Sequence, residues 1–255
     1  MLSHQDTEQA LSYSNYWDEQ YATATGDKPT HEWHRSFSQL ESFFQNHLFR
    51  NKSKDTRILH LGSGNSVSSF SLLHKLVSLL SSIEKLYISL ALPAFLESNK
   101  LTYHQSVPYD LLDRGYRNQL CINFSTVVAN LMKSRHADKP QVAWQVGDVR
   151  NMNGIACNSV DVVFDKCTLD CMSYGSPWSP PKEVLENSRM YLREVWRVLK
   201  DDGVFLYVTY RQPHFVKPIL NSHDEWDLDM EVLGGGVGTF HYFGFILKKH
   251  STGSG

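Results

Sequence analysis

Arg57-Ile-Leu-His-Leu-Gly-Ser-Gly-Asn-Ser66 joins a buried-strand pattern to a glycine turn, a combination typical of nucleotide-binding α/β sheets. Glycines such as Gly62 and Gly64 let the main chain turn sharply and approach a ligand with no Cβ between them. Ser66 and Val67 stand two and three positions after Gly64, so the third glycine of a pyrophosphate-binding fingerprint is missing. The turn therefore favours S-adenosylmethionine, which carries one nucleoside and no phosphate, over NAD.

Further apolar runs predict the remaining strands, at 120–122, 142–146, 160–164 and 204–208. Between the last two lies Val184–Leu199, where apolar residues recur at steps of three and four and predict a helix. Asp201-Asp-Gly203 is expected to end this helix, with the glycine in the left-handed conformation. Alternating strands and helices predict a mostly parallel sheet covered on both faces.

The C-terminal part has a different pattern. Met230–Leu233, the glycine turn 234–236 and the alternating run Thr239–Leu247 predict two antiparallel strands joined as a hairpin. A parallel α/β sheet that ends in such a hairpin is the seven-stranded, Rossmann-like layout of class I methyltransferases. We expect this domain to span 56–250, after an N-terminal helical extension at 1–55 and before a flexible tail at 251–255.

Composition narrows the class of protein. The net charge of −2 over 255 residues gives no electrostatic footprint for nucleic acid. The polar N-terminus does not resemble a secretory signal, and no apolar stretch reaches the length of a membrane span. The four cysteines lack metal-binding spacing, so we expect no metal site and read them as core or turn residues. A cytoplasmic protein without nucleic-acid or membrane partners is expected, and its oligomeric state is left open.

Candidate cofactor residues follow the ends of successive predicted strands, where such sheets bind their ligands. They are Gly62 and Gly64, then Asn123 and Phe124, then Asp148 and Val149, and finally Asp165 and Lys166. Asp148 suits a hydrogen bond from an adenine amino group, and Val149 offers a main-chain N–H to the ring. The alternative for Asp148 is that it only caps a turn.

Five motifs together resemble a known family: Tyr16-Trp-Asp-Glu-Gln-Tyr21, Leu61–Ser66, Gly115-Tyr-Arg-Asn118, Gly147-Asp-Val-Arg150 and Asp165-Lys-Cys-Thr-Leu-Asp170. They look like the class I methyltransferases around elongation factor 1-alpha lysine methyltransferase 4, a group that includes relatives of the dual methyltransferase 13 type. The resemblance implies S-adenosylmethionine-dependent transfer to protein lysine, with an elongation factor as substrate. It also implies that Trp17, Tyr21, Gly64, Asp148, Val149 and Lys166 contact the cofactor and that 165–170 is needed for activity.

The same motifs suggest the catalytic residues, for which we take Asp165, Lys166 and Asp170. Either aspartate can orient an acceptor amine or take its proton through water. Trp17 and Tyr21 lie four apart on a predicted helix and can cover the sulfonium or line a lysine channel, or simply pack on the core. His31 and His214 are better read as surface or core residues than as part of the site.

Two residues depart from the family pattern. Asn123 replaces an aspartate that holds both ribose hydroxyls, at an expected cost of about 1–3 kcal/mol in cofactor binding. Cys167 replaces a glycine, which costs about 1 kcal/mol if that position needs positive φ. A catalytically inactive binding module and a small-molecule methyltransferase therefore stay open as alternatives.

Residues 67–105 fit neither the fold nor the family. The segment has ten leucines, eight serines and no Asp, Arg or Gly, and removing its 39 residues restores the usual spacing between Gly64 and Asn123. Val67-Ser68 can be encoded by a 5′ splice signal and Gln105 by a 3′ splice signal. We hypothesise a translated intron, with a genuine amphipathic insertion as the alternative, and predict that the 216-residue form without it binds cofactor better.

Overall fold

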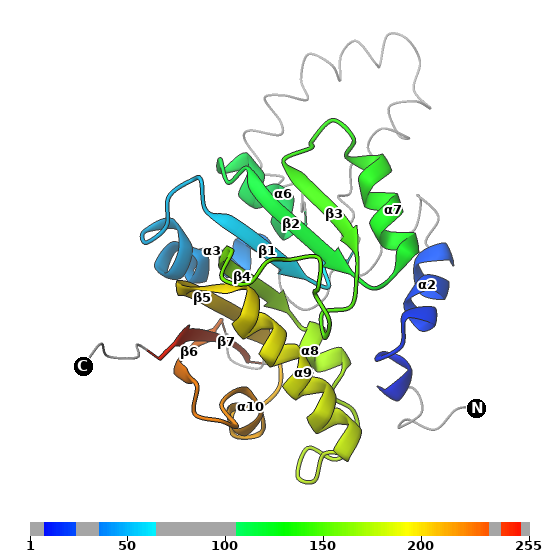
Figure 1. The fold of residues 1–255 in the computed structure, drawn as a ribbon, viewed down its shortest axis with the longest axis vertical. Coiled ribbons are helices and arrows are strands. Elements are labelled where there is room, and N and C mark those ends of the chain that lie inside the picture. The colour runs from blue at the N-terminus through cyan, green and yellow to red at the C-terminus, as the bar shows by residue number, and fades with distance from the viewer. Residues whose placement is uncertain (1–7, 24–35, 65–105, 235–240, 251–255) are drawn as a thin grey trace.

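A computed structural model describes residues 8–23, 36–64, 106–234 and 241–250. Seven strands form one sheet in the order β3-β2-β1-β4-β5-β7-β6, with helices on both sides (Figure 1). The strands are β1 (Arg57–Leu61), β2 (Asn118–Asn123), β3 (Val142–Val146), β4 (Val160–Lys166), β5 (Leu199–Thr209), β6 (Trp226–Leu233) and β7 (Tyr242–Lys249). The helices are α2 (Ser14–Thr23), α3 (Phe37–Phe44), the π-helix η1 (Gln45–Phe49), α6 (Val107–Asp113), α7 (Thr126–Arg135), α8 (Thr168–Cys171), α9 (Lys182–Val198) and α10 (Pro213–Leu220).

The pairing confirms the predicted sheet. β1 pairs in parallel with β2 and β4, β2 with β3, and β4 with β5. β7 runs antiparallel to both β5 and β6, so the C-terminal hairpin is confirmed as well. The carboxyl ends of β1 to β4 therefore meet at one edge. The predicted insertion 67–105, the hairpin turn at 235–240, His31 and the tail 251–255 lie outside the described residues.

Successive side chains of a strand point to opposite faces of the sheet, so the hydrophobic core is divided between the two faces. Phe205 and Tyr207 of β5 pack with α9 and α10, in a cluster that also holds Leu59 and Leu61 of β1. Val204, Leu206 and Val208 of β5 point to the other face of the sheet and pack with α3, η1 and α6. Burying both faces explains why the strands read as continuous apolar runs.

The end of α9 differs from its prediction. The helix ends at Val198, and β5 begins at Leu199 and runs through Gly203. Gly203 is not among the positive-φ glycines of the described chain, so the expected left-handed cap is wrong. A glycine is needed there for space, because a Cβ would lie 2.7 Å from the Leu199 Cδ1 and 2.9 Å from the Lys200 carbonyl oxygen.

In the part of the chain that the structure describes, no helix is both long enough and apolar enough to cross a membrane.

Candidate cofactor-binding and active site

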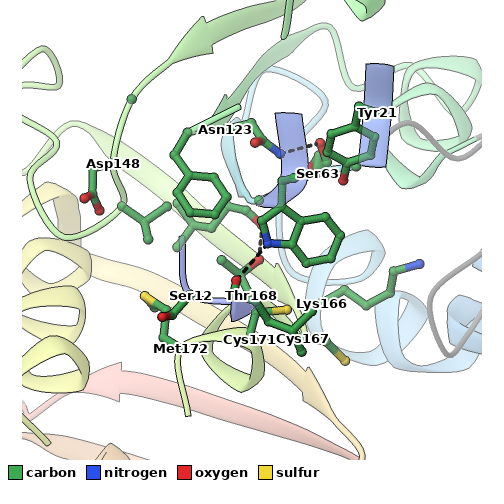
Figure 2. Close-up of a pocket in the computed structure, with 18 of the residues that line it drawn as sticks. Ser12, Tyr21, Ser63, Asn123, Asp148, Lys166, Cys167, Thr168, Cys171 and Met172 are labelled. Atoms are coloured by element: carbon green, nitrogen blue, oxygen red, sulfur yellow. Dashed lines mark hydrogen bonds between the residues drawn. The ribbon is translucent and has the colours of Figure 1, made fainter. Parts of the chain in front are cut away.

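A cavity of about 230 Å³ opens at the carboxyl edge of the sheet, between α2 and the strand ends. All of the predicted cofactor-binding residues line it: Trp17, Tyr21, Gly62, Gly64, Asn123, Phe124, Asp148, Val149 and Lys166. In Figure 2, Asp148 lies on one side of this cavity, and Tyr21 and Lys166 lie on the other. Residues distant in sequence thus meet at a single site.

The two glycines of the turn after β1 differ in how much space a side chain would have. Gly62 has φ +62°, and a Cβ there would lie 2.2 Å from the Thr168 Oγ1. Thr168 is itself fixed, since its hydroxyl donates to the Leu61 carbonyl at 2.8 Å. Gly64 is different, because its Cβ would meet only the Tyr21 hydroxyl, at 3.1 Å. Gly62 is therefore required by the turn itself, whereas Gly64 leaves the main chain uncovered where it lines the cavity.

Asp148 follows β3 and is held by Arg150. Arg150 donates its main-chain N–H to Asp148 Oδ1 at 2.8 Å and its Nη2 to Oδ2 at 2.7 Å. Burial alone would raise the pKa of Asp148, but the hydrogen bonds and charge of Arg150 outweigh it and leave the pKa below its ordinary value. The carboxylate is therefore ionised while its side chain stays 38% exposed. Asp148 closes a turn and also presents a negative charge to the cavity.

Asn123 uses both ends of its amide within the protein. Its Oδ1 accepts from the Ser125 main-chain N–H at 2.9 Å, and its Nδ2 donates to the Ser63 carbonyl at 3.2 Å. The second contact ties the end of β2 to the glycine turn after β1. An aspartate has no donor for that contact, so asparagine here stabilises the turn as well as lining the cavity.

The wall opposite the sheet comes from α2. The Trp17 and Tyr21 rings are stacked with centroids 5.7 Å apart, and the Trp17 Nε1 donates to the Leu11 carbonyl at 2.8 Å. Both rings are largely buried, and burial raises the pKa of Tyr21. They pack on the core and line the cavity at once, so the two interpretations of this pair are compatible.

Asp18, on the same helix, fastens α2 to the rest of the fold. Its Oδ1 accepts from the Ser125 hydroxyl at 2.6 Å and from the Val127 main-chain N–H at 3.4 Å, both at the start of α7. A carboxylate at a helix N-terminus is favoured by the helix dipole. Sequence reasoning overlooked this residue, although it stands inside the Tyr16–Tyr21 motif.

These features fit a nucleoside cofactor with a cationic centre. The space above Gly64 admits close approach of a ligand, and the exposed Asp148 carboxylate offers an acceptor at the far wall. The walls between them are mainly apolar and aromatic, as small-molecule sites usually are.

Comparisons with known proteins also support a cofactor-binding site. The family described as a methyltransferase domain matches residues 106–207. The chain is 28% identical to EEF1A lysine methyltransferase 4 of Mus musculus over 237 residues, 92% of this chain and 74% of that protein. The Bos taurus protein of the same name is 29% identical over the same shares. These matches and the order of the strands support an S-adenosylmethionine-dependent methyltransferase with a class I, Rossmann-like fold. The crystal structure of the 4+2 cyclase SpnF has the same fold, with a TM-score of 0.56 and 12% identity, covering 94% of this chain and 97% of that one.

In this methyltransferase the predicted catalytic aspartates do not line the cavity, which corrects the expectation that they face the amine. Asp165 is fully buried and accepts from the Thr168 and Leu169 main-chain N–H groups at 2.7 and 3.1 Å. The Tyr191 hydroxyl donates to it at 2.6 Å. Burial raises the pKa of Asp165 to about 7, against these hydrogen bonds. Asp165 therefore anchors the start of α8.

Asp170 has a similar place at the other end of α8. The Thr209 hydroxyl donates to its Oδ1 at 2.6 Å, and the Arg211 Nε lies 3.3 Å from the same oxygen. Burial raises the pKa of Asp170, with Thr209 and Arg211 opposing. The two aspartates thus hold α8 against its neighbours, while Lys166, the last residue of β4, lines the cavity.

Cys121, Cys167 and Cys171 are buried or partly buried and behave as packing residues, whereas Cys157 is exposed. Cys167 has φ +67°, so its position does require the left-handed conformation that the glycine comparison predicts. Cys167 and Cys171 both line the cavity, and burial raises the pKa of Cys171 to about 12, which keeps its thiol neutral. Cys121 is fully buried, and His214 lies exposed on α10. Within the described ranges no group of three or more His, Cys, Asp or Glu can hold a metal ion.

Proposed function

We propose that this methyltransferase modifies a lysine side chain of the translation elongation factor eEF1A in the cytoplasm. The observation that carries the proposal is the similarity to eEF1A lysine methyltransferase 4 along 92% of the chain. The site supports it, because residues of the Tyr16–Tyr21 helix and of the 165–170 segment, which carry the family resemblance, line one cavity. We also propose the domain limits 56–250 for the catalytic fold.

In the proposed site Asp148, Val149, Asn123 and the glycine turn hold the nucleoside part of the cofactor. When bound, S-adenosylmethionine supplies an electrophilic methyl group on a sulfonium centre. The half-exposed Asp148 carboxylate accepts a hydrogen bond from the base, and Val149, buried beside it, shields the ring from water.

The acceptor lysine must lose its proton before it attacks. Among the residues described, Asp148 is the one carboxylate that lines the cavity, and we assign it to the cofactor. Deprotonation is then favoured by the walls themselves, since an apolar environment lowers the pKa of an entering ammonium group. Trp17 and Tyr21 align the amine, and positioning supplies most of the rate. Asp165 and Asp170 act as positioning residues through α8.

The direct test incubates the purified chain with methyl-labelled S-adenosylmethionine and purified eEF1A. We expect label in one lysine-containing peptide, identified by mass spectrometry. Asp148→Ala, which removes the proposed adenine acceptor, should abolish both the label and the heat of cofactor binding in calorimetry. Its melting temperature should fall only slightly, because the side chain carries little core packing and its hydrogen bonds to Arg150 are partly exposed.

Each alternative has its own outcome in this assay. Label confined to small metabolites of a lysate, with none on protein, would replace lysine by a small-molecule acceptor. Absence of binding heat at millimolar S-adenosylmethionine would leave a methyltransferase fold acting as a binding module. Full label with Asp148→Ala would show that Asp148 only closes its turn.

A further inference from the structure

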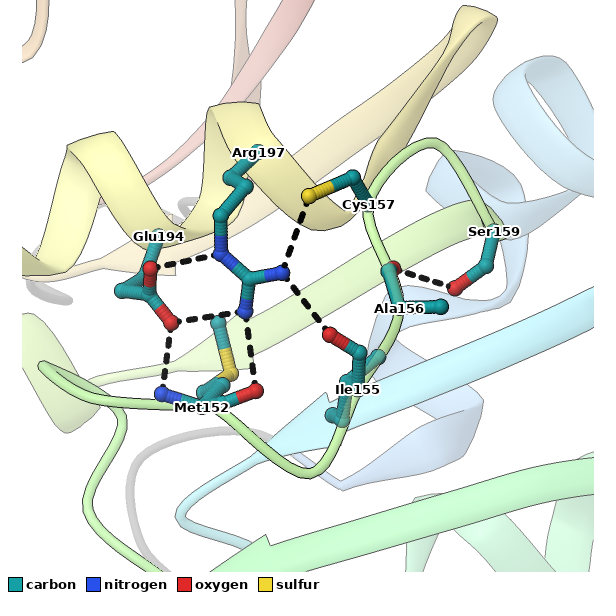
Figure 3. Close-up of polar contacts among 7 residues, drawn as sticks. All are labelled: Met152, Ile155, Ala156, Cys157, Ser159, Glu194 and Arg197. Atoms are coloured by element: carbon teal, nitrogen blue, oxygen red, sulfur yellow. Dashed lines mark hydrogen bonds and ion pairs between the residues drawn. The ribbon is translucent and has the colours of Figure 1, made fainter.

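Arg197, near the end of α9, reaches across to the loop that connects β3 to β4 (Figure 3). Its Nη2 donates to the Met152 carbonyl and its Nη1 to the Ile155 carbonyl, both at 2.8 Å. The Nη1 also lies 3.4 Å from the Cys157 Sγ. One planar guanidinium therefore donates to two carbonyls of the loop at once, from two nitrogens whose relative positions are fixed, unlike the rotating donors of an ammonium group.

Glu194, one turn earlier on the same helix, completes the arrangement. Its carboxylate accepts from the Arg197 Nε at 2.7 Å and from the Met152 main-chain N–H at 2.5 Å. Met152 is thus held by both its N–H and its carbonyl. The Glu194 side chain is 14% exposed, so these contacts are partly shielded from water and retain more strength than surface ion pairs.

A second contact joins α9 to the same loop further upstream. The Arg150 Nη1 donates to the Asn187 Oδ1 at 2.9 Å, while its other atoms hold Asp148. Asn187 and Glu194 are seven residues apart and lie on one face of the helix. Two points on α9 therefore fix the loop that carries Asp148 and Val149 into the cavity.

We propose that Arg197 and Glu194 are positioning residues that set cofactor affinity without touching the cofactor. They keep the 148–157 loop in the conformation in which Asp148 and Val149 line the cavity. Loss of the pair lets the loop sample other conformations, and the apparent dissociation constant rises in inverse proportion to the fraction of molecules that keep the binding conformation. The inference rests on the proposed cofactor role of Asp148 and Val149, and it is independent of the acceptor.

The same helix offers a matched control. Arg189 and Glu186 form an ion pair with the same three-residue spacing, at 2.9 Å. Their side chains are 58% and 52% exposed, and the pair's hydrogen bonds stay between the two residues. Removing this pair changes charge and helix propensity as removing Arg197 does, with no contact to the loop.

The experiment compares Arg197→Met, Arg197→Lys and Glu194→Gln with Arg189→Met in the full chain. We expect Arg197→Met to raise the dissociation constant of S-adenosylmethionine about tenfold in calorimetry. The KM for the cofactor should rise in parallel, with kcat at saturation changed less than twofold. In the cofactor-free protein, amide exchange across 148–157 should accelerate at least tenfold, while exchange in β5 stays unchanged.

The lysine and glutamine variants separate geometry from charge. Arg197→Lys keeps the positive charge but loses the planar set of guanidinium N–H donors, so we expect it to behave like Arg197→Met. Glu194→Gln keeps the acceptor for Met152 and should show an intermediate loss. Arg189→Met should match the parent in all measurements.

Three results would overturn the proposal. These are parental cofactor affinity in Arg197→Met, full recovery in Arg197→Lys, or faster exchange spread over β5, which would indicate general unfolding. Asp148→Ala is measured alongside. If it retains parental affinity, the cofactor role of the loop fails, whereas a loss in Asp148→Ala without one in Arg197→Met refutes the positioning role alone.

Discussion

Replacing Gly62 by alanine should lower the free energy of unfolding by about 3 kcal/mol. The left-handed backbone at φ +62° costs an L-residue about 1 kcal/mol. The new Cβ would lie 2.2 Å from the Thr168 Oγ1, so Thr168 must rotate and give up its hydrogen bond to the Leu61 carbonyl, worth about 1 kcal/mol. The off-rotamer side chain that results adds a comparable amount, about 1 kcal/mol.

Urea unfolding followed by circular dichroism measures this loss, which corresponds to a fall of about 6–12 °C in melting temperature. Gly64→Ala is the control, since its Cβ meets only the Tyr21 hydroxyl, and it should stay within about 0.5 kcal/mol of the parent. The double variant Gly62→Ala/Thr168→Ala should show a favourable coupling of at least about 1 kcal/mol, because the clashing atoms are gone. Parental stability of Gly62→Ala, or strict additivity in the double variant, would refute this account of the turn.

Two further predictions concern the core and the ribose position. Burial lowers the pKa of His60 from 6.5 to about 4, so its stabilising effect is complete above pH 6.5 and disappears as the pH falls toward 4. The raised pKa of Asp165 acts in the opposite direction over the same range, so the prediction is a difference between two proteins. Between pH 7 and 5 the parent should lose about 2 kcal/mol more than His60→Leu by urea unfolding, and an equal pH dependence of the two would contradict this. Asn123→Asp should lower the melting temperature of the cofactor-free protein, because the donor to Ser63 is lost, yet tighten S-adenosylmethionine binding severalfold; calorimetry showing unchanged or weaker binding would place the ribose elsewhere.

Sequence patterns predicted the sheet well because a strand buried on both faces must be apolar throughout. Arg57–Leu61 was placed at its exact limits, and the residues at the ends of β1 to β4 converge because parallel strands end at one edge. The departure at Cys167 was also recognised in advance, since a family glycine implied the positive φ that the structure has.

Side-chain direction was harder to predict. Asp165 and Asp170 stand in a motif tied to activity, yet the motif does not say whether a carboxylate faces the cavity or the N-terminus of α8. The Arg197 contacts escaped prediction for a related reason. They connect two segments more than forty residues apart through main-chain carbonyls, which leave no trace in residue identity.

The fastening of α2 by Asp18 has a consequence for how this pocket can change over evolutionary time. One wall is built from strand ends, so substitutions there are constrained by folding. The facing wall belongs to a short helix attached through Ser125 and Val127, and its exposed positions are free of the sheet. New ligand preferences can therefore arise at a cavity-lining position of α2 that the core does not bury, such as Gln20, at less risk to the fold than at Trp17 or Tyr21.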